Sequence, residues 1–168
     1  PLHTIDHTFV LQEFFVPRGR FTEWVHAAKP TLTARYKKVT LLNCTVRFVL
    51  EDNTTLLRYS RAQEGSFAFV LYYRVVRNGE GDMELAQIHQ HLTKITLASG
   101  GTFYLPYRHH YTKEQLVEAY PRIEEFFQKK VDYDPHKLFS SSWSEHYMGL
   151  VLPSHEWKPL PQQDPKKP

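Results

Sequence analysis

Residues 39–50 begin with VTLLNCTVRF, which alternates two kinds of side chain with a period of two residues. This is the period of a β-strand, in which successive side chains point to opposite faces of the sheet. The apolar face carries Leu42, Cys44, Val46 and Phe48. The polar face carries Asn43, Thr45 and Arg47. We expect the apolar face to lie in the core, and the polar face to be either an ordinary solvated surface or a binding surface for a polar ligand.

Length and composition favour one ordinary domain. With 168 residues, 41% of them hydrophobic, the chain can bury a core without the help of disulfides. Its single cysteine, Cys44, falls on the apolar face of the strand. We expect it to be a small buried hydrophobic side chain rather than a reactive thiol.

Targeting signals and clustered charge are missing from the sequence. No stretch is apolar for the length of a membrane span and no secretory signal opens the chain, so we expect no transmembrane segment and a cytoplasmic location. Membrane association of a full-length protein stays open. The formal charge of +3 comes from scattered residues, so no nucleic-acid partner is expected. Because the chain starts with Pro1 and not with methionine, we expect that it was processed or cut from something longer.

Alternation and turn residues predict further strands at residues 8–16, 66–76 and 102–105. Residues 66–76, SFAFVLYYRVV, are the most apolar segment and have to form an interior strand. Between these strands, an apolar stripe over residues 21–28 predicts a helix that ends before Pro30.

Two more amphipathic helices are predicted from their capping residues. One is capped by Asp82 and ends at Gly100 and Gly101. The other begins at a capping box of Thr112 and Gln115, restarts at Pro121 and runs to about Lys130. Residues 138–143 are expected to be a loop or a short turn, and the Pro-rich residues 153–168 a flexible tail.

This order of elements predicts an α+β fold, with an antiparallel or mixed sheet and helices packed on one face. The other face, which carries Asn43, Thr45 and Arg47, is then open.

Histidine pairs invite a metal hypothesis, but their spacing argues against it. His89 and His91 point about 200° apart on a helix, so they cannot chelate together and are expected on the helix surface. His109 and His110 have no cysteine or carboxylate at ligand spacing, and no metal is expected. The seven glycines are dispersed, with no loop that could cradle a pyrophosphate.

A series of short blocks resembles a known family. In order along the chain they are EFFVP at 13–17, TVR at 45–47, FAFVLY at 67–72, GGTFYLPY at 100–107, YPR at 120–122 and DPHKLF at 134–139. The chain is similar, over residues 8–148, to the C-terminal substrate (cap) domain of FAD-linked oxidases of the vanillyl-alcohol oxidase superfamily. The nearest branch is that of D-arabinono-1,4-lactone oxidase and alditol oxidase.

The resemblance implies that residues 1–152 are the substrate domain of a larger FAD-dependent oxidoreductase. Such an enzyme oxidises a CH–OH donor by hydride transfer to flavin. The partner would be an N-terminal FAD-binding domain of the same polypeptide, which holds the cofactor, and the chain alone would be inactive. The open sheet face would form the roof of the active site over a small-molecule substrate.

The resemblance also suggests roles for individual residues. The family's Glu-x-Arg pair falls on Thr45 and Arg47, so the arginine is kept and the glutamate is replaced; a lysine of some relatives falls near Tyr107. Arg47 is the expected cation toward the flavin, with Tyr107 or His109 as proton acceptor. The substrate-binding residues would be Asn43, Thr45, Arg108 and His110. The cofactor-binding residues would be Ser141, where the family has an asparagine, and Trp143.

Two alternatives stay open at this point. Arg47 could form a salt bridge on the sheet face. The whole chain could be a free-standing α+β module that binds RNA or a protein partner, although the aromatic signature typical of RNA-binding sheets is missing.

Overall fold

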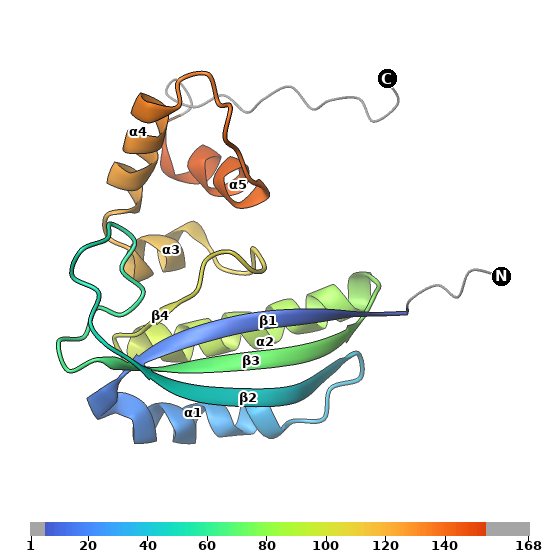
Figure 1. Cartoon of the computed structure of the whole chain (residues 1–168). Coiled ribbons are helices and arrows are strands. Elements are labelled where there is room, and N and C mark those ends of the chain that lie inside the picture. Colours follow the sequence, from blue (N-terminus) through green and yellow to red (C-terminus); the bar gives the residue numbers. More distant parts are fainter. Residues whose placement is uncertain (1–5, 154–168) are drawn as a thin grey trace.

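The computed structural model describes residues 6–153 of the chain (Figure 1). Within that part, four strands form one antiparallel sheet in the order β2-β3-β1-β4. The strands are β1 (His7–Pro17), β2 (Val39–Val49), β3 (Ser66–Val76) and β4 (Thr102–Phe103). The α-helices are α1 (Phe21–Thr33), α2 (Gly79–Ala98), α3 (Lys113–Ala119), α4 (Ile123–Tyr133) and α5 (Ser142–Val151), with a short 3-10 turn, η1, at Arg18–Arg20. The predicted α+β class is confirmed, and the sheet is antiparallel.

The two central strands, β1 and β3, pair along their whole length and supply one side of the core. Residues that pair across strands share a face, so Phe14 of β1 lies on the same face as its partner Phe69 of β3. The indole of Trp24 in α1 packs against both rings, with centroid distances of 6.3 Å to Phe14 and 4.1 Å to Phe69. Helices α1 and α2 therefore cover this face (Figure 1), and β3 is the interior strand that the sequence predicts.

Strand β2 lies at the edge of the sheet, and the face predicted to be core is largely exposed there. Leu42, Val46 and Phe48 are 45%, 45% and 46% exposed, and Cys44 is exposed as well. The predictions of a buried apolar face and a buried Cys44 are therefore wrong. This face does point to the helix side of the sheet, because Val46 pairs with Phe69. An edge strand, however, has a neighbour on one side only, and the rings of α1 pack over β3.

Helix α1 begins where the sequence predicts but continues through Pro30. The prediction that it ends before this proline is wrong. In the last turn Thr31 is buried and Leu32 packs against the core, while the carbonyl of Thr31 accepts a hydrogen bond from the hydroxyl of Tyr36 at 3.0 Å. These contacts offset the backbone hydrogen bond that a proline cannot donate.

Helix α2 is capped by Asn78, and the prediction of Asp82 as its cap is wrong. The Oδ1 atom of Asn78 accepts a hydrogen bond from the backbone N–H of Gly81 at 2.9 Å. A Cβ at Gly81 would lie 2.1 Å from the carbonyl oxygen of Val76, so the tight turn from β3 into α2 requires glycine there. The helix ends as predicted, with Gly100 in the left-handed conformation at φ 72°.

The C-terminal part contains more helix than the sequence indicates. The capping box of Thr112 and Gln115 is confirmed, but the predicted single helix is divided into α3 and α4. Residues 138–143 were predicted as a loop or turn, whereas α5 begins at Ser142. Its Tyr147 and Met148 are 0% exposed, so tertiary packing stabilises a helix whose serine-rich start is typical of a loop. The predicted tail lies outside the described residues beyond Pro153.

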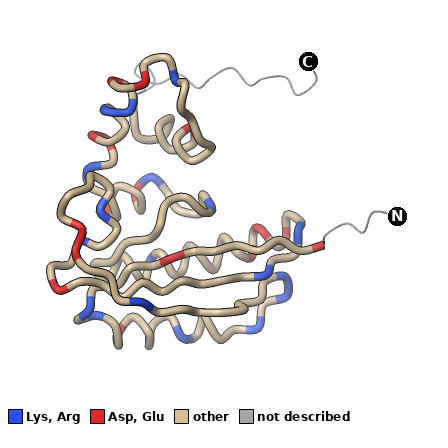
Figure 2. Tube along the Cα trace, in the orientation of Figure 1, with Lys and Arg blue, Asp and Glu red and all other residues tan. Residues whose placement is uncertain are grey.

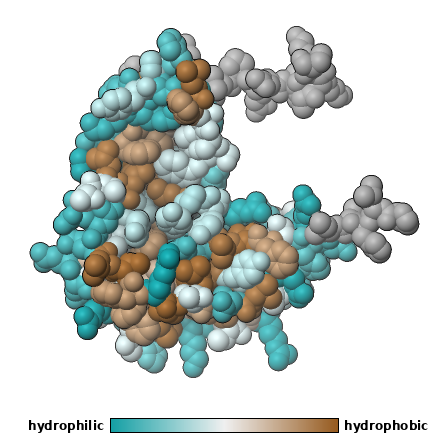
Figure 3. Space-filling view, in the orientation of Figure 1, coloured by the Kyte–Doolittle hydropathy of each residue, from teal (hydrophilic) through white to brown (hydrophobic). Residues whose placement is uncertain are grey.

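Helices α3, α4 and α5 form a helical arm that rises from the β4 edge of the sheet (Figure 1). Figure 3 shows a hollow between this arm and the sheet, and hydrophobic residues gathered over the strands. Figure 2 shows basic and acidic positions distributed over both parts of the described chain.

The sheet face opposite α1 and α2 is covered at one end. There Tyr59 and Tyr104 pack against Phe15, with ring centroids 4.8 Å and 6.2 Å away. Farther along, Phe9 is 57% exposed and stacks at 5.6 Å on Tyr72. The face is therefore open along part of β1 and β3, as predicted, and closed beside β4.

Candidate functional site

Three polar side chains meet on the open sheet face. Nη2 of Arg47 donates a hydrogen bond to Oε2 of Glu13 at 2.8 Å, and the hydroxyl of Tyr107 donates one to Oε1 of Glu13 at 3.0 Å. We call Glu13, Arg47 and Tyr107 the sheet-face triad. The sequence predicts two of these residues, Arg47 and Tyr107, as site residues. The third, Glu13, connects them and was not predicted.

The strand register explains why these residues meet. Glu13 of β1 and Thr45 of β2 both pair with Val70 of β3, so all three lie on one face. Arg47, two residues beyond Thr45, pairs with Ala68. Glu13 pairs with Val70, so the long side chain of Arg47 crosses β3 diagonally to reach it on the far strand. Tyr107 comes from the loop that follows β4.

The exposure of the triad is uneven. The side chain of Glu13 is 8% exposed and that of Arg47 is 57% exposed. A buried carboxylate is costly unless it is paired and hydrogen-bonded, and here Arg47 and Tyr107 supply both contacts. The salt bridge left open as one role of Arg47 is thus present. Because more than half of its side chain is exposed, the guanidinium can also receive a ligand from the open face.

The environment of Tyr107 opposes loss of its proton. Burial, the hydrogen bond to Glu13 and the negative charge of Glu13 together raise the pKa of Tyr107 to about 12, although Arg47 acts in the opposite direction. At neutral pH Tyr107 is therefore a neutral phenol that donates its hydrogen bond to Glu13.

A polar pocket of about 300 Å³ adjoins the triad. We call it the loop pocket; it is lined by Asp82, Tyr107, Arg108, His109, His110 and Ser142. It brings together four of the predicted site residues, those at 107–110, with the first turn of α2 and the start of α5. Tyr107 belongs both to this pocket and to the triad.

His109 lies on the side of the loop pocket nearer to α5. Its ring stacks on His146 at 5.1 Å and meets Tyr147 edge-on at 5.5 Å. Burial lowers the pKa of His109, and the nearby His146 and Arg108 lower it further. The imidazole is therefore neutral at neutral pH and has a nitrogen that can accept a proton.

His110 turns toward α2 and contacts a buried histidine. Its Nδ1 lies 3.0 Å from Nδ1 of His89, and its Nε2 lies 3.7 Å from a carboxylate oxygen of Asp82. His89 is 2% exposed, so its predicted place on the helix surface is wrong. Burial, with the charges of His110 and Arg108, lowers the pKa of His89 to about 3.

The predicted substrate residues of β2 lie beside the triad. Asn43 donates a hydrogen bond from Nδ2 to Oγ1 of Thr45 at 3.1 Å, and both residues are exposed. Together with the accessible part of Arg47 they form a short polar row along the edge strand.

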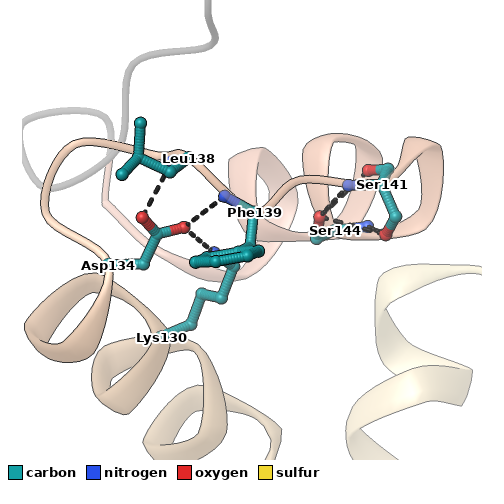
Figure 4. Close-up of polar contacts among 6 residues, drawn as sticks. All are labelled: Lys130, Asp134, Leu138, Phe139, Ser141 and Ser144. Carbon is teal, nitrogen blue, oxygen red and sulfur yellow. Dashed lines mark hydrogen bonds and ion pairs between the residues drawn. The ribbon is translucent and has the colours of Figure 1, made fainter.

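The predicted cofactor residues of α5 are used within the helical arm. Ser141 and Ser144 form a reciprocal capping box at the start of α5, and Asp134 binds the backbone N–H groups of Leu138 and Phe139 just before it (Figure 4). The indole N–H of Trp143 donates to the hydroxyl of Tyr111 at 2.7 Å. Neither predicted residue contacts the triad.

Two further observations concern residues 6–153. They contain no group of three or more His, Cys, Asp or Glu side chains placed to hold a metal ion. None of the helices described there is both long and apolar enough to cross a membrane.

Glu13 was missed because its partners lie far away along the chain. The sequence carried one signal for it, since Glu13 shares its strand face with Phe9, Leu11 and Phe15. A carboxylate on an apolar strand face is expected to have a partner, because glutamate is almost never buried unpaired. The identity of that partner follows from the register.

Comparison with known proteins addresses the resemblance noted in the sequence. A search of curated proteins gave no match. The family model of D-arabinono-1,4-lactone oxidase matches the chain over residues 3–147, which include the triad, the loop pocket and the start of α5. The chain therefore belongs to the D-arabinono-1,4-lactone oxidase family, as the C-terminal domain of an FAD-linked oxidase.

Proposed function

We propose that this chain is the substrate-binding domain of an FAD-dependent oxidoreductase that oxidises a CH–OH donor, of the sugar, alditol or lactone type. The observation that carries the proposal is the sheet-face triad, in which a half-exposed arginine and a neutral phenol share one buried carboxylate beside a polar pocket. Membership of the family supports the reaction class.

The residues on the open sheet face fit a flavin. The rings of Phe9 and Tyr72, which stack on each other at 5.6 Å, are partly exposed there, and the accessible guanidinium of Arg47 lies on the same face of the sheet. We propose that FAD is held mainly by an N-terminal domain of the same polypeptide and that its ring system meets this face. Ser141 and Trp143 stay as proposed cofactor contacts, although the polar atoms of both already have partners inside the helical arm.

Bound flavin supplies the two-electron oxidation by accepting a hydride from the carbinol carbon. The residues of this chain orient the carbinol and stabilise the charge that develops as its hydroxyl loses a proton. Arg47 is suited to the second task because its cation faces the open side of the sheet. Tyr107 and His109 are the two candidate acceptors of the hydroxyl proton.

The composition and size of the loop pocket support the proposed substrate class. Its lining residues carry hydroxyl, imidazole, guanidinium and carboxylate groups, and its volume of about 300 Å³ suits a small polyhydroxylated molecule. We propose Arg108 and His110, with Asn43 and Thr45 on β2, as the substrate-binding residues.

The first test is reconstitution. The chain would be produced together with the FAD domain encoded upstream of it. A panel of sugar lactones and alditols would then be added without oxygen, and flavin reduction would be followed by absorbance at about 450 nm, in the visible flavin band. We expect reduction by at least one CH–OH donor, and neither flavin binding nor turnover by the 168-residue chain alone. Tight stoichiometric FAD uptake by the chain alone, or an intact holoenzyme that no CH–OH donor reduces, would contradict the proposal.

A further inference from the structure

Glu13 receives one hydrogen bond at each carboxylate oxygen, from Arg47 at Oε2 and from Tyr107 at Oε1. Its side chain is 8% exposed, so a substrate on the open face meets Arg47 and Tyr107 before it meets the carboxylate. Glu13 is thus a carboxylate shielded from the open face. Of its two hydrogen-bond partners, Tyr107 is the one that also lines the loop pocket.

The direction of the hydrogen bond decides what Tyr107 can do for a substrate. An ionised carboxylate only accepts hydrogen bonds, so the phenol must donate its proton to Glu13. The lone pairs of the phenol oxygen are then available to accept a hydrogen bond from a substrate hydroxyl in the loop pocket. The ring of Tyr107 packs on Tyr104 at 5.6 Å, which holds the oxygen in place.

Tyr107 cannot serve as a base by itself at neutral pH. Burial and the neighbouring Glu13 raise the pKa of Tyr107 to about 12, so the phenolate is scarce. A phenol that gives up its own proton while it receives another never becomes a phenolate, and Glu13 lies 3.0 Å away to take that proton.

We propose that Glu13 is the final acceptor of the substrate's hydroxyl proton, reached through Tyr107, and the inference rests on the function proposed above. As the carbinol carbon loses its hydride to the bound flavin, the hydroxyl proton passes to the oxygen of Tyr107 and the phenol proton passes to Oε1 of Glu13. The donor loses one hydride and one proton and becomes a carbonyl compound, Tyr107 is unchanged, and Glu13 ends neutral. Arg47 holds the other carboxylate oxygen, Oε2, with a hydrogen bond at 2.8 Å. Glu13 acts through Tyr107 and is in this sense a positioning residue, not one that touches the substrate.

The first arm of the test needs no turnover. Tyrosine labelled with ¹³C at Cζ would be titrated by NMR in the 168-residue chain, with Tyr107→Phe used to assign the signal of Tyr107. In Glu13→Gln the pKa of Tyr107 should fall from about 12 toward its ordinary value of 10.0. Glu84→Gln is the matched control, because Glu84 raises the pKa of Tyr36 and is not among the causes acting on Tyr107. An unchanged titration of Tyr107 in Glu13→Gln would overturn the relay.

The second arm follows the rate of flavin reduction in the holoenzyme. Glu13→Gln should lower the rate about a hundred-fold or more, as expected for the loss of a general base. Glu13→Asp, which keeps a carboxylate, should restore part of the rate. Tyr107→Phe should cost as much as Glu13→Gln, and the double variant no more than either one.

The outcomes separate this inference from the proposed function. A holoenzyme that no CH–OH donor reduces refutes the function, while the NMR titration still decides whether Glu13 and Tyr107 are coupled. A holoenzyme that keeps its rate of flavin reduction in Glu13→Gln and loses it in His109→Gln assigns the proton to His109 and overturns the inference.

Discussion

Glu13 on β1 and Arg47 on β2 form an ion pair with an Nη2–Oε2 distance of 2.8 Å, although β3 lies between their strands. Neighbouring strands are about 4.8 Å apart, so the pair spans roughly twice that distance over the backbone of β3. Ala68, the partner of Arg47 on β3, is 0% exposed. Because its side chain is small, we expect Ala68 to leave room for Arg47 to cross β3.

A larger side chain at Ala68 is expected to separate the pair. Ala68→Leu should lower the free energy of unfolding by about 1–3 kcal/mol, the usual range for an overpacked site. In that background Arg47→Ala should have a smaller further effect than in the wild type, because the ion pair is already broken. Urea denaturation of the four proteins in this cycle measures both effects. Fully additive effects of the two substitutions would show that Arg47 does not need the space above Ala68.

Loss of the Arg47 cation is expected to slow turnover strongly. Arg47→Ala in the holoenzyme should reduce the catalytic constant about a hundred- to a thousand-fold, or about 2.7–4 kcal/mol, as when one donor to a developing oxyanion is removed. The matched control is Arg122→Ala, because Arg122 also forms an ion pair with a glutamate, Glu125, but lies in the helical arm outside the triad and the loop pocket. Flavin content is measured first, so that a folding defect is not read as a catalytic one. Flavin reduction at near wild-type rate would leave Arg47 with only the ion pair to Glu13.

The buried His89 is expected to make the fold sensitive to acid. Its pKa is about 3 in the folded chain and near 6.5 when exposed, so between these values the unfolded chain binds more protons. The stability that His89 contributes is therefore fully present above pH 6.5 and is lost as the pH falls toward 3.

Urea denaturation at a series of pH values checks this prediction. His89→Leu should show a shallower loss of stability than the wild type as the pH falls from 6.5 toward 3. His91→Leu is the control, because His91 is exposed on the same helix. Equal slopes for the two variants would show that His89 does not drive the acid sensitivity.

Two residues, Asn78 and Asp82, are candidates for the N-cap of α2, and their substitutions are expected to differ in cost. Asn78→Ala should reduce the free energy of unfolding by about 1 kcal/mol, because it leaves the N–H of Gly81 without its acceptor. Asp82→Asn should cost less, since it removes only the interaction of a first-turn charge with the helix dipole and with His110. Thermal or urea unfolding ranks the two variants, and a larger cost at Asp82 would restore the cap that the sequence predicts.

Cys44 is expected to react in the folded protein. It is exposed on the edge strand, so a thiol reagent such as DTNB should modify it without denaturant. Partial burial raises the pKa of the Cys44 thiol, so the reaction should be slow at neutral pH and speed up as the pH rises. Modification that requires urea would instead support a buried cysteine.

Features that depend on near neighbours could be read from the sequence. The alternation over residues 66–76 predicts the interior strand, the Thr112 capping box predicts the start of α3, and Gly100 predicts the end of α2. Each depends on side chains within a few residues of one another, whose spacing the chain itself sets. The face to which Arg47 points follows from the same local rule.

Contacts between distant segments could not be read in this way. Alternation assigns Val46 and Phe48 to one face, but whether that face is buried depends on β2 being the edge strand, which pairing with β3 decides. His89 is buried because the loop at His110 folds back on α2. The serine-rich start of α5 is typical of a loop, and the buried Tyr147 makes it a helix.

The sequence by itself therefore determined the α+β class, the strand that carries Arg47 and the family to which the chain belongs. Only the tertiary structure placed Glu13 between Arg47 and Tyr107, which lie 34 and 94 positions away from it. The physical reason is that the pattern along one strand sets which face a side chain takes, while strand order and register set what lies opposite it.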